Sequence, residues 1–325
     1  MRPPNLMQHH TLTLVVNQAA GGLLDGSITP EDIAERLGDA GFEVDLLSGS
    51  PAGIRERLER AVEMPSNVIV VAGGDGTINT AAQVLAGSGK TLAVIPAGTL
   101  NHLTRDLGIP GDVDGAIQVL RTGEETSIDV GEVNGQLFLC SSVIGFASRL
   151  GGQRERWRGQ LSPWTWARLF VRIARTLYRD PRLDVRLTPR GETPLRTRYL
   201  MISVGAYDEG PGQVLTRSHL DSGRFGIYAV RRPTLIRLLR LFAAILVGRW
   251  RQMPDLVATD AVEVTVTCGR PRLRAMNDGE VKLLDTPLRY SIRPRALRVL
   301  RAPPVAEAED AQFARPDAAG EVAPA

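Results

Sequence analysis

The clearest chemical feature of the sequence is GGDGT at residues 73–77, which directly follows the apolar segment 67–72. Glycines let the backbone turn tightly and approach an anion with no Cβ in the way. Their amides, with the N-terminus of a following helix, direct positive partial charge at a phosphate. Asp75 would be repelled by a bare phosphate, so its presence indicates a nearby Mg²⁺, which prefers oxygen ligands. The pattern predicts phosphate binding, and its alternative is a simple strand-to-helix turn.

Two more glycine-containing loops follow other predicted strands. PAGTLNH at residues 96–102 comes after an apolar strand at 91–95, and NQAAGG at 17–22 comes after a strand at 12–16. In an open parallel sheet, ligands bind beyond the carboxyl ends of the strands. Any one of these loops could be an ordinary turn. Three of them at one edge predict a shared binding cleft.

Up to about residue 125, apolar strands alternate with helical segments. The predicted strands are 12–16, 42–47, 67–72 and 91–95, and the predicted helices begin at 30, 54, 78 and 113. Continuous apolar strands between helices indicate a parallel sheet that is covered on both faces. We therefore predict a three-layer α/β nucleotide-binding domain over residues 10–125.

After Gly123, strand-like segments follow one another mostly without helices, which is typical of antiparallel β structure. We predict a β-sandwich domain over residues 126–302 that binds the substrate, and its last strand can return to the first domain. Residues 303–325, rich in proline, alanine and acid, are predicted to be a disordered tail. The predicted strands are 127–133, 136–143, 183–188, 199–204, 225–230, 261–267 and 288–293.

Composition is that of a globular protein, with 43% hydrophobic and 23% charged residues in a chain of 325, long enough for two domains. Cys140 and Cys268 are too few for a disulfide framework, and we expect buried thiols in a reducing compartment. The start of the chain lacks a signal-peptide pattern. The most apolar segment, 235–247, contains two arginines and is shorter than the roughly 20 residues that span a bilayer. These features predict a cytoplasmic protein.

Taken in order, the motifs resemble the diacylglycerol kinase catalytic family, especially its bacterial soluble lipid kinases. The resemblance covers about residues 11–302 and rests on GGDGT at 73–77, PAGTLNHLTRDLGIP at 96–110 and the distant DGE at 278–280. Sphingosine kinases share the fold, and NAD kinases share the GGDG pattern more remotely. The resemblance implies an ATP-dependent kinase that phosphorylates a lipid hydroxyl, such as that of diacylglycerol, in a cleft between the two domains.

The resemblance also assigns individual residues. Asp278 matches the aspartate that takes the proton from the lipid hydroxyl, and Glu280 matches a supporting carboxylate. Alone, Asp-Gly-Glu is more typical of a turn, but phosphoryl transfer needs Mg²⁺ and a carboxylate directed at the attacking hydroxyl. The predicted ATP-binding positions are Asn17, Gln18, Ala19, Ala20, Gly21, Ser48, Gly73, Gly74, Asp75, Gly76, Thr77, Ile78, Asn79, Thr80, Gly98, Thr99 and Asn101.

A second metal site is implied by HLDSGR at residues 219–224, which resembles a loop that holds a structural Mg²⁺. In the relatives the aspartate directly precedes the glycine, whereas here Ser222 does and Asp221 is one position earlier. The alternative is an ordinary hairpin turn. The candidate ligands are His219, Asp221, Ser222 and Arg224.

Two arginine-rich segments indicate how the protein would reach a lipid substrate in a membrane. Residues 149–198 hold thirteen arginines against four acids, and residues 231–251 hold six arginines and no acid among many leucines. Basic amphipathic helices suit the headgroup region of anionic membranes, so we expect peripheral contact with the inner face of the membrane. The alternative is that the apolar faces pack on the β domain. No nucleic-acid recognition module accompanies the arginines, and the oligomeric state is open, a homodimer included.

Two other functions stay open at this point. A kinase for a soluble hydroxyl substrate, such as a nucleotide or sugar, would carry the same loops. A nucleotide-binding regulator without catalysis would also carry them, although retention of Asp75, Asn101, Asp278 and Glu280 argues against it. The lipid kinase hypothesis requires the carboxylate of Asp278 to lie near the phosphate loop in space.

Overall fold

The computed structural model describes residues 11–18, 28–49, 53–98, 101–145, 182–188, 195–210, 215–230 and 234–303. Several predictions fall outside these residues. They are residues 149–181 of the first arginine-rich segment, the tail beyond 303, and the site residues Ala19, Ala20, Gly21 and Thr99.

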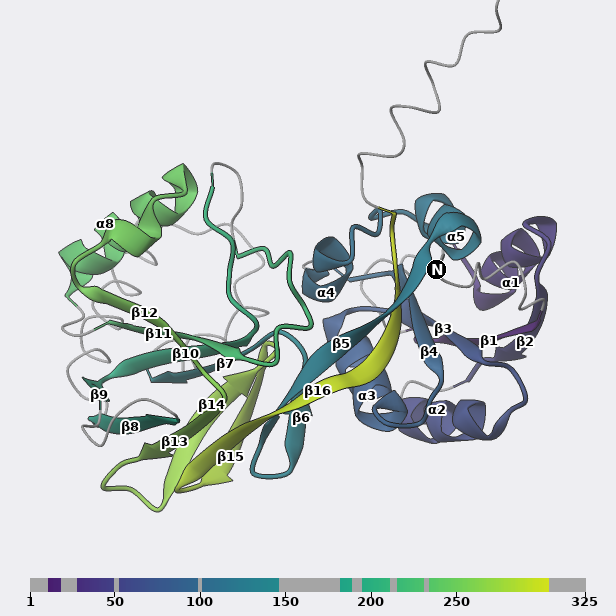
Figure 1. Cartoon of the computed structure of the whole chain (residues 1–325). Coiled ribbons are helices and arrows are strands. Elements are labelled where there is room, and N and C mark those ends of the chain that lie inside the picture. The colour runs from purple at the N-terminus through teal and green to yellow at the C-terminus, as the bar shows by residue number, and fades with distance from the viewer. Residues whose placement is uncertain are drawn as a thin grey trace, which may run out of the picture.

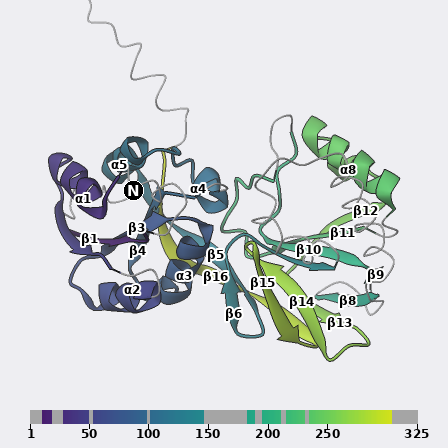
Figure 2. The same ribbon diagram turned by 180° about the vertical axis from the view of Figure 1, so that it is seen from behind.

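The N-terminal half is a parallel sheet between two layers of helices (Figures 1 and 2). Its strands are β1 (Thr11–Val16), β2 (Glu43–Leu47), β3 (Val68–Gly73) and β4 (Thr91–Pro96), and its helices are α1 (Pro30–Asp39), α2 (Ile54–Glu63), α3 (Asp75–Leu85), α4 (His102–Asp106) and α5 (Val113–Thr122). The strands lie side by side in the order β2-β1-β3-β4, all parallel. Helices α1 and α5 cover one face and α2 and α3 the other (Figure 1). Because both faces are covered, β3 and β4 bury every residue.

The C-terminal half contains a second, antiparallel sheet in the order β12-β11-β10-β7-β14-β15. The apolar core of this half lies between that sheet and β8, β13 and β16 of the first sheet. The predicted α/β domain followed by antiparallel β structure is confirmed. The elements of this half are β5 (Glu124–Val133), β6 (Gln136–Phe138), β7 (Ser141–Gly145), β8 (Leu183–Thr188), β9 (Leu195–Thr197), β10 (Tyr199–Val204), β11 (Phe225–Val230), α8 (Leu235–Val247), η4 (Trp250–Gln252), β12 (Leu256–Ala261), β13 (Glu263–Thr267), β14 (Arg272–Asn277), β15 (Glu280–Asp285) and β16 (Leu288–Arg301).

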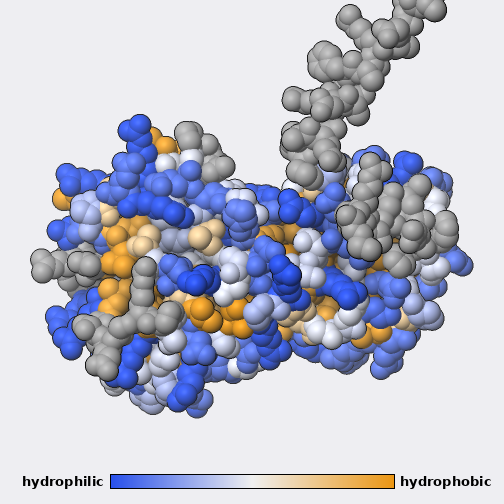
Figure 3. Space-filling model, viewed as in Figure 1, coloured by the Kyte–Doolittle hydropathy of each residue, from blue (hydrophilic) through white to orange (hydrophobic). Residues whose placement is uncertain are grey.

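Helix α8 has apolar side chains on two sides. Leu241, Ala244 and Ile245 pack against an aromatic cluster that contains Tyr207, Tyr228 and Trp250. A second set, Ile236, Leu239, Leu246 and Val247, is between 52% and 66% exposed. In the space-filling view, hydrophobic residues reach the surface at the upper left, where Figure 1 places α8 (Figure 3). Among the described residues, no helix combines the length and apolarity needed to cross a membrane.

Strand β16 joins the two halves (Figure 1). It pairs with β13 near its start and runs parallel to β4 near its end, with β5 antiparallel beside it throughout. A register shift between Arg293 and Leu297 marks the bend, where Arg295 has a φ of 49°. The carboxylate of Asp129, 1% exposed, accepts the N–H of Arg295 at 2.9 Å and the N–H of Gly223 at 2.6 Å. One buried side chain therefore holds the bend in β16 and the loop before β11.

Replacing Asp129 by alanine removes both of these charge-assisted hydrogen bonds. We expect the free energy of unfolding to fall by about 3 kcal/mol, since each hydrogen bond to a charged group contributes roughly 1.5–3 kcal/mol. Urea denaturation measures the loss. The matched control is Asp184→Ala, which removes an exposed ion pair with Arg196 and should cost less than about 1 kcal/mol. Equal losses for the two variants would contradict the role given to Asp129.

Candidate active site

The phosphate loop, residues 73–77, forms the junction between β3 and α3. Helix α3 begins at Asp75, three residues earlier than the sequence predicted, with Gly74 as its N-cap. The loop therefore supplies the first turn of the helix, whose N–H groups have no partner within the helix. A Cβ on Gly73 would lie 2.6 Å from the Thr77 Cβ, so the tight turn requires glycine there.

The loop after β4 lies directly against the phosphate loop. A Cβ on Gly98 would lie 2.8 Å from the Cα of Gly74 and 2.7 Å from Asn101 Oδ1. Asn101 has a φ of 46°, and its side-chain amide accepts the N–H of Gly98 at 3.1 Å and donates to the carbonyl of Gly98 at 3.0 Å. The two loops thus pack backbone against backbone, as the shared edge of parallel strands predicts.

The third predicted loop joins them through Asn17, which follows β1. Its Nδ2 donates to Thr77 Oγ1 at 2.7 Å. Gln18 comes next in the same loop, and Ser48 is exposed just after β2, at the same edge of the sheet. The structure therefore brings the described residues of all three loops to the carboxyl ends of the strands.

The three residues after Thr77 differ in their surroundings. Ile78 and Asn79 are 1% and 2% exposed, and Asn79 Oδ1 is buried with no hydrogen-bond partner. The Thr80 hydroxyl donates to the carbonyl of Gly76 at 2.9 Å. Of these three residues, Thr80 is the one that is partly exposed.

The carboxylate of Asp75 binds the start of α4. It accepts the N–H of Asn101 at 3.0 Å and the N–H of His102 at 2.9 Å. Both are first-turn amides, which lack a partner within the helix. Each carboxylate oxygen still has a free lone pair, so these bonds do not exhaust its capacity as an oxygen ligand.

Asp278 lies in a two-residue turn that joins β14 to β15, a hairpin that the sequence analysis did not predict. Asp278 and Gly279 have φ values of 47° and 89°, and this pair of positive values is typical of a type I′ turn. The Asp278 carboxylate is half-buried. It accepts the N–H of Leu139 at 2.7 Å, that of Cys140 at 2.8 Å and that of Ser141 at 2.9 Å.

These surroundings raise the pKa of Asp278 above its ordinary value. Burial is the main cause, because it disfavours the charged form. The three N–H donors and the positive charge of Arg217 act in the opposite direction and offset part of the effect. A carboxylate with a raised pKa accepts a proton more readily at a working pH, as a general base must.

Glu280 brings this hairpin onto the phosphate loop. A Cβ on Gly76 would lie 3.4 Å from Glu280 Oε1, and Lys282 Nζ lies 3.5 Å from Glu280 Oε2. Residues about two hundred positions apart in the sequence therefore meet at the first turn of α3. The hairpin that carries Asp278 therefore lies beside the phosphate loop, through Glu280.

Sequence analysis missed Arg57, a cation behind this edge of the sheet. It lies on α2, is 7% exposed, and donates to the carbonyl of Val16 at 3.3 Å. A Cβ on Gly49 would lie 3.1 Å from its Nη1. Burial lowers its pKa. The sequence signal for Arg57 is its i, i+4 spacing from Ala61. Residues four positions apart lie on the same face of a helix, and this face of α2 is the buried one.

The loop at 219–224 is arranged differently from a cation site. Asp221 Oδ2 lies 3.4 Å from Arg295 Nη2, so a metal ion bound there would meet a positive charge. Arg224 pairs with Asp260 at 2.6 Å. Among the described residues, no three His, Cys, Asp or Glu side chains are grouped to hold a metal ion. A structural Mg²⁺ at this loop stays a prediction that the side chains do not fit.

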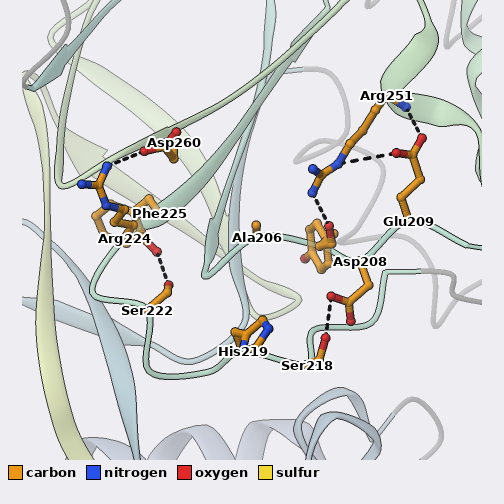
Figure 4. Close-up of a pocket in the computed structure, with 11 residues that line it drawn as sticks. Ala206, Asp208, Glu209, Ser218, His219, Ser222, Arg224, Phe225, Arg251 and Asp260 are labelled. Carbon is orange, nitrogen blue, oxygen red and sulfur yellow. Dashed lines mark hydrogen bonds and ion pairs between the residues drawn. The ribbon is translucent and has the colours of Figure 1, made fainter.

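His219 and Ser222 instead line an open cavity of about 520 Å³ between the loop and η4 (Figure 4). The charged residues that line it bond to one another. Ser218 donates to Asp208 at 2.7 Å, and the N–H of Arg251 donates to Glu209 at 3.0 Å. The charged side chains of the cavity wall are therefore already paired.

Comparison with known proteins agrees with the geometry. Residues 11–133 match the diacylglycerol kinase catalytic domain family. A diacylglycerol kinase of Mycobacterium tuberculosis is 29% identical over 275 residues, which cover 82% of this chain and 87% of that protein. One from Staphylococcus epidermidis is 24% identical over 263 residues, 78% of this chain and 81% of that protein.

The fold is also shared with a solved structure. A crystal structure of a diacylglycerol kinase from Bacillus anthracis superposes with a TM-score of 0.66 at 19% identity and covers 91% of this chain and 98% of that one. At this identity the likeness shows the fold alone. The resemblance drawn from the motifs is confirmed: residues 11–133 of this chain match the diacylglycerol kinase catalytic domain, and the curated relatives and the solved structure are similar over most of the chain.

Proposed function

We propose that this protein is an ATP-dependent lipid kinase that transfers the γ-phosphate to the hydroxyl of diacylglycerol or a related lipid alcohol. The match to the diacylglycerol kinase catalytic domain and the similarity to curated diacylglycerol kinases support a lipid kinase. The observation that carries the proposal is the approach of the Glu280 carboxylate to Gly76, where a Cβ would lie 3.4 Å from Glu280 Oε1, because it puts the hairpin that carries Asp278 and Glu280 beside the phosphate loop. Phosphoryl transfer needs this combination of positioned phosphate and oriented carboxylate.

The phosphate loop would bind the triphosphate. The first N–H groups of α3 have no helical partner and carry the positive end of the helix dipole. Gly73, Gly74 and Gly98 leave the backbone bare of side chains at this point, and a Cβ on Gly73 or Gly98 would collide with its neighbours. Asn17 and Thr77 add neutral polar groups at its edge. The remaining predicted ATP contacts, including Ser48 and Thr99, stay part of the proposal.

Mg²⁺ is part of the same proposal. Asp75 is the side chain that would hold it, because a carboxylate with free lone pairs at a phosphate site is a ligand that Mg²⁺ prefers. When bound, the ion neutralises negative charge on the phosphates.

In the proposed reaction the lipid hydroxyl oxygen forms a bond to the γ-phosphorus while the bond to the bridging oxygen of ADP breaks. The hydroxyl proton passes to Asp278, whose raised pKa suits this role. Glu280 supports the turn from beside Gly76. One observation favours a second assignment: three N–H groups already occupy the oxygens of Asp278, whereas the Glu280 side chain is 49% exposed. Glu280 is therefore the alternative proton acceptor.

Helix α8 would hold the protein at the inner face of an anionic membrane. Its apolar set, Ile236, Leu239, Leu246 and Val247, is between 52% and 66% exposed. Residues 231–251 contain six arginines and no acid, and Arg240 and Arg249 are exposed near this set. Apolar insertion beside positive charge is the combination that binds anionic headgroups.

The base assignment is tested by neutralising each carboxylate. We expect Asp278→Asn to lower kcat by about 10²–10⁴, the usual contribution of a general base, and Glu280→Gln to lower it less. Both should keep the affinity for ATP. The assay follows labelled phosphate from ATP into a total lipid extract and identifies the product.

The matched control is Asp285→Asn, an exposed carboxylate on the same hairpin that pairs with Arg272. A larger loss in Glu280→Gln than in Asp278→Asn would transfer the base to Glu280. Wild-type protein that phosphorylates no lipid but phosphorylates a water-soluble acceptor would overturn the choice of substrate.

The pH dependence of kcat offers a separate test. The base must be ionised to take a proton, so activity is lost as pH falls through the pKa of Asp278. Because burial raises that pKa, we expect the acid midpoint of the kcat profile to lie above about 3.9, the ordinary aspartate value. A midpoint at or below that value, in protein shown to be folded by circular dichroism, would contradict the assignment.

Membrane binding is tested with Leu239→Glu. Burial of a leucine contributes about 1.5–3 kcal/mol, so we expect binding to vesicles that contain phosphatidylglycerol to weaken at least tenfold. Activity on a dispersed short-chain diacylglycerol should not change. Val262→Glu, at a residue 40% exposed outside α8, is the control. Equal binding by both variants would exclude α8 as the docking surface.

A further inference from the structure

Arg217 is a buried cation in the C-terminal half. Its side chain is 1% exposed, and the carboxylate of Asp106 that it binds is 3% exposed. All five guanidinium donors are used. Asp106 Oδ2 accepts from Nε at 2.9 Å and from Nη2 at 2.5 Å. Nη1 donates to the carbonyl of Leu139 at 3.0 Å and to that of Val204 at 2.7 Å. The second hydrogen of Nη2 points to Cys140 Sγ, 3.3 Å from the nitrogen. A guanidinium bonded in this way has one orientation.

One peptide unit lies between this cation and the carboxylate of Asp278. Arg217 binds the carbonyl oxygen of Leu139, and the N–H of the same peptide, that of Cys140, donates to Asp278 Oδ1. A positive charge at the oxygen polarises the peptide and strengthens its N–H as a donor. Arg217 therefore orients the amide group that holds Asp278.

On its other side Arg217 is tied to the phosphate loop. Asp106 is the last residue of α4, a helix of five residues, and the first turn of α4 is bound by the carboxylate of Asp75. The main-chain N–H of Arg217 also donates to Asp106, at 3.1 Å. Hydrogen bonds and one short helix thus connect Asp75 to Asp278 through Arg217.

We propose that Arg217 is a positioning residue that, with Asp106, keeps the Asp278 turn aligned with the phosphate loop. The assignment rests on the proposed function, because it concerns the geometry of phosphoryl transfer. A purely structural ion pair would need the contact with Asp106 alone. The additional bond to the carbonyl of Leu139, on the β6–β7 connection, is what reaches the amides that bind Asp278, and the bond to the carbonyl of Val204 fixes the guanidinium against the end of β10.

The test compares Arg217→Met and Arg217→Lys. We expect Arg217→Met to lower kcat per folded molecule at least about tenfold, since small displacements of reacting groups have effects of this size, with KM for ATP within threefold of wild type. Lysine keeps the charge and can bind Asp106 but not both carbonyls, so it should restore part of kcat. Hydrogen exchange of the amides of residues 139–141 should accelerate in both variants.

Arg272→Met, an exposed arginine on β14, is the control and should match the wild type in kcat and exchange. If Arg217→Met does not fold, kcat and the hydrogen exchange of residues 139–141 are measured in Arg217→Lys instead. Wild-type kcat and unchanged exchange at residues 139–141 in a folded Arg217 variant would overturn the assignment. Wild-type protein that phosphorylates no lipid would instead overturn the proposed function, while the exchange data still report whether Arg217 holds the turn.

Discussion

The carboxylate of Asp278 is bound by three consecutive backbone N–H groups, and the arrangement of the candidate site depends on this interaction. Successive residues of a regular strand point their N–H groups to opposite edges, so three in a row cannot meet on one carboxylate. The chain therefore leaves β6 after Phe138 and resumes as β7 at Ser141. Because the same turn carries Glu280, holding Asp278 also places Glu280 against Gly76.

Negative charge is concentrated around this interaction, and its compensation comes from the backbone more than from cations. Asp75 binds two first-turn amides of α4, Asp278 binds three loop amides, and Asp106 binds the buried Arg217. Cys140 lies within this group, and burial raises the pKa of its thiol, so it stays protonated. The sequence predicted Cys140 and Cys268 as buried thiols, and the structure shows both free and half-buried.

Several elements could be predicted because their residues carry a local signal. Strands β3 and β4 are uniformly apolar and are buried throughout. Thr29 begins α1 with a reciprocal capping box to Asp32, as a threonine before proline and two acids indicates. The start of α3 was predicted too late, because its first residues, Asp75, Gly76 and Thr77, are weak helix formers. The β14–β15 hairpin was missed although Asp278-Gly279 is a strong hairpin signal, because the turn was recognised but no strand was predicted on either side of it.

By itself the sequence determined the α/β alternation, the phosphate loop and the set of loops at one sheet edge, because periodicity and glycine spacing are local properties of the chain. Only the tertiary structure decided what faces that loop. The approach of Glu280 to Gly76, the amides around Asp278 and the burial of Arg217 each join residues separated by more than seventy positions. Such contacts depend on how β16 carries the second half back to β4, and no local pattern of residues encodes that path.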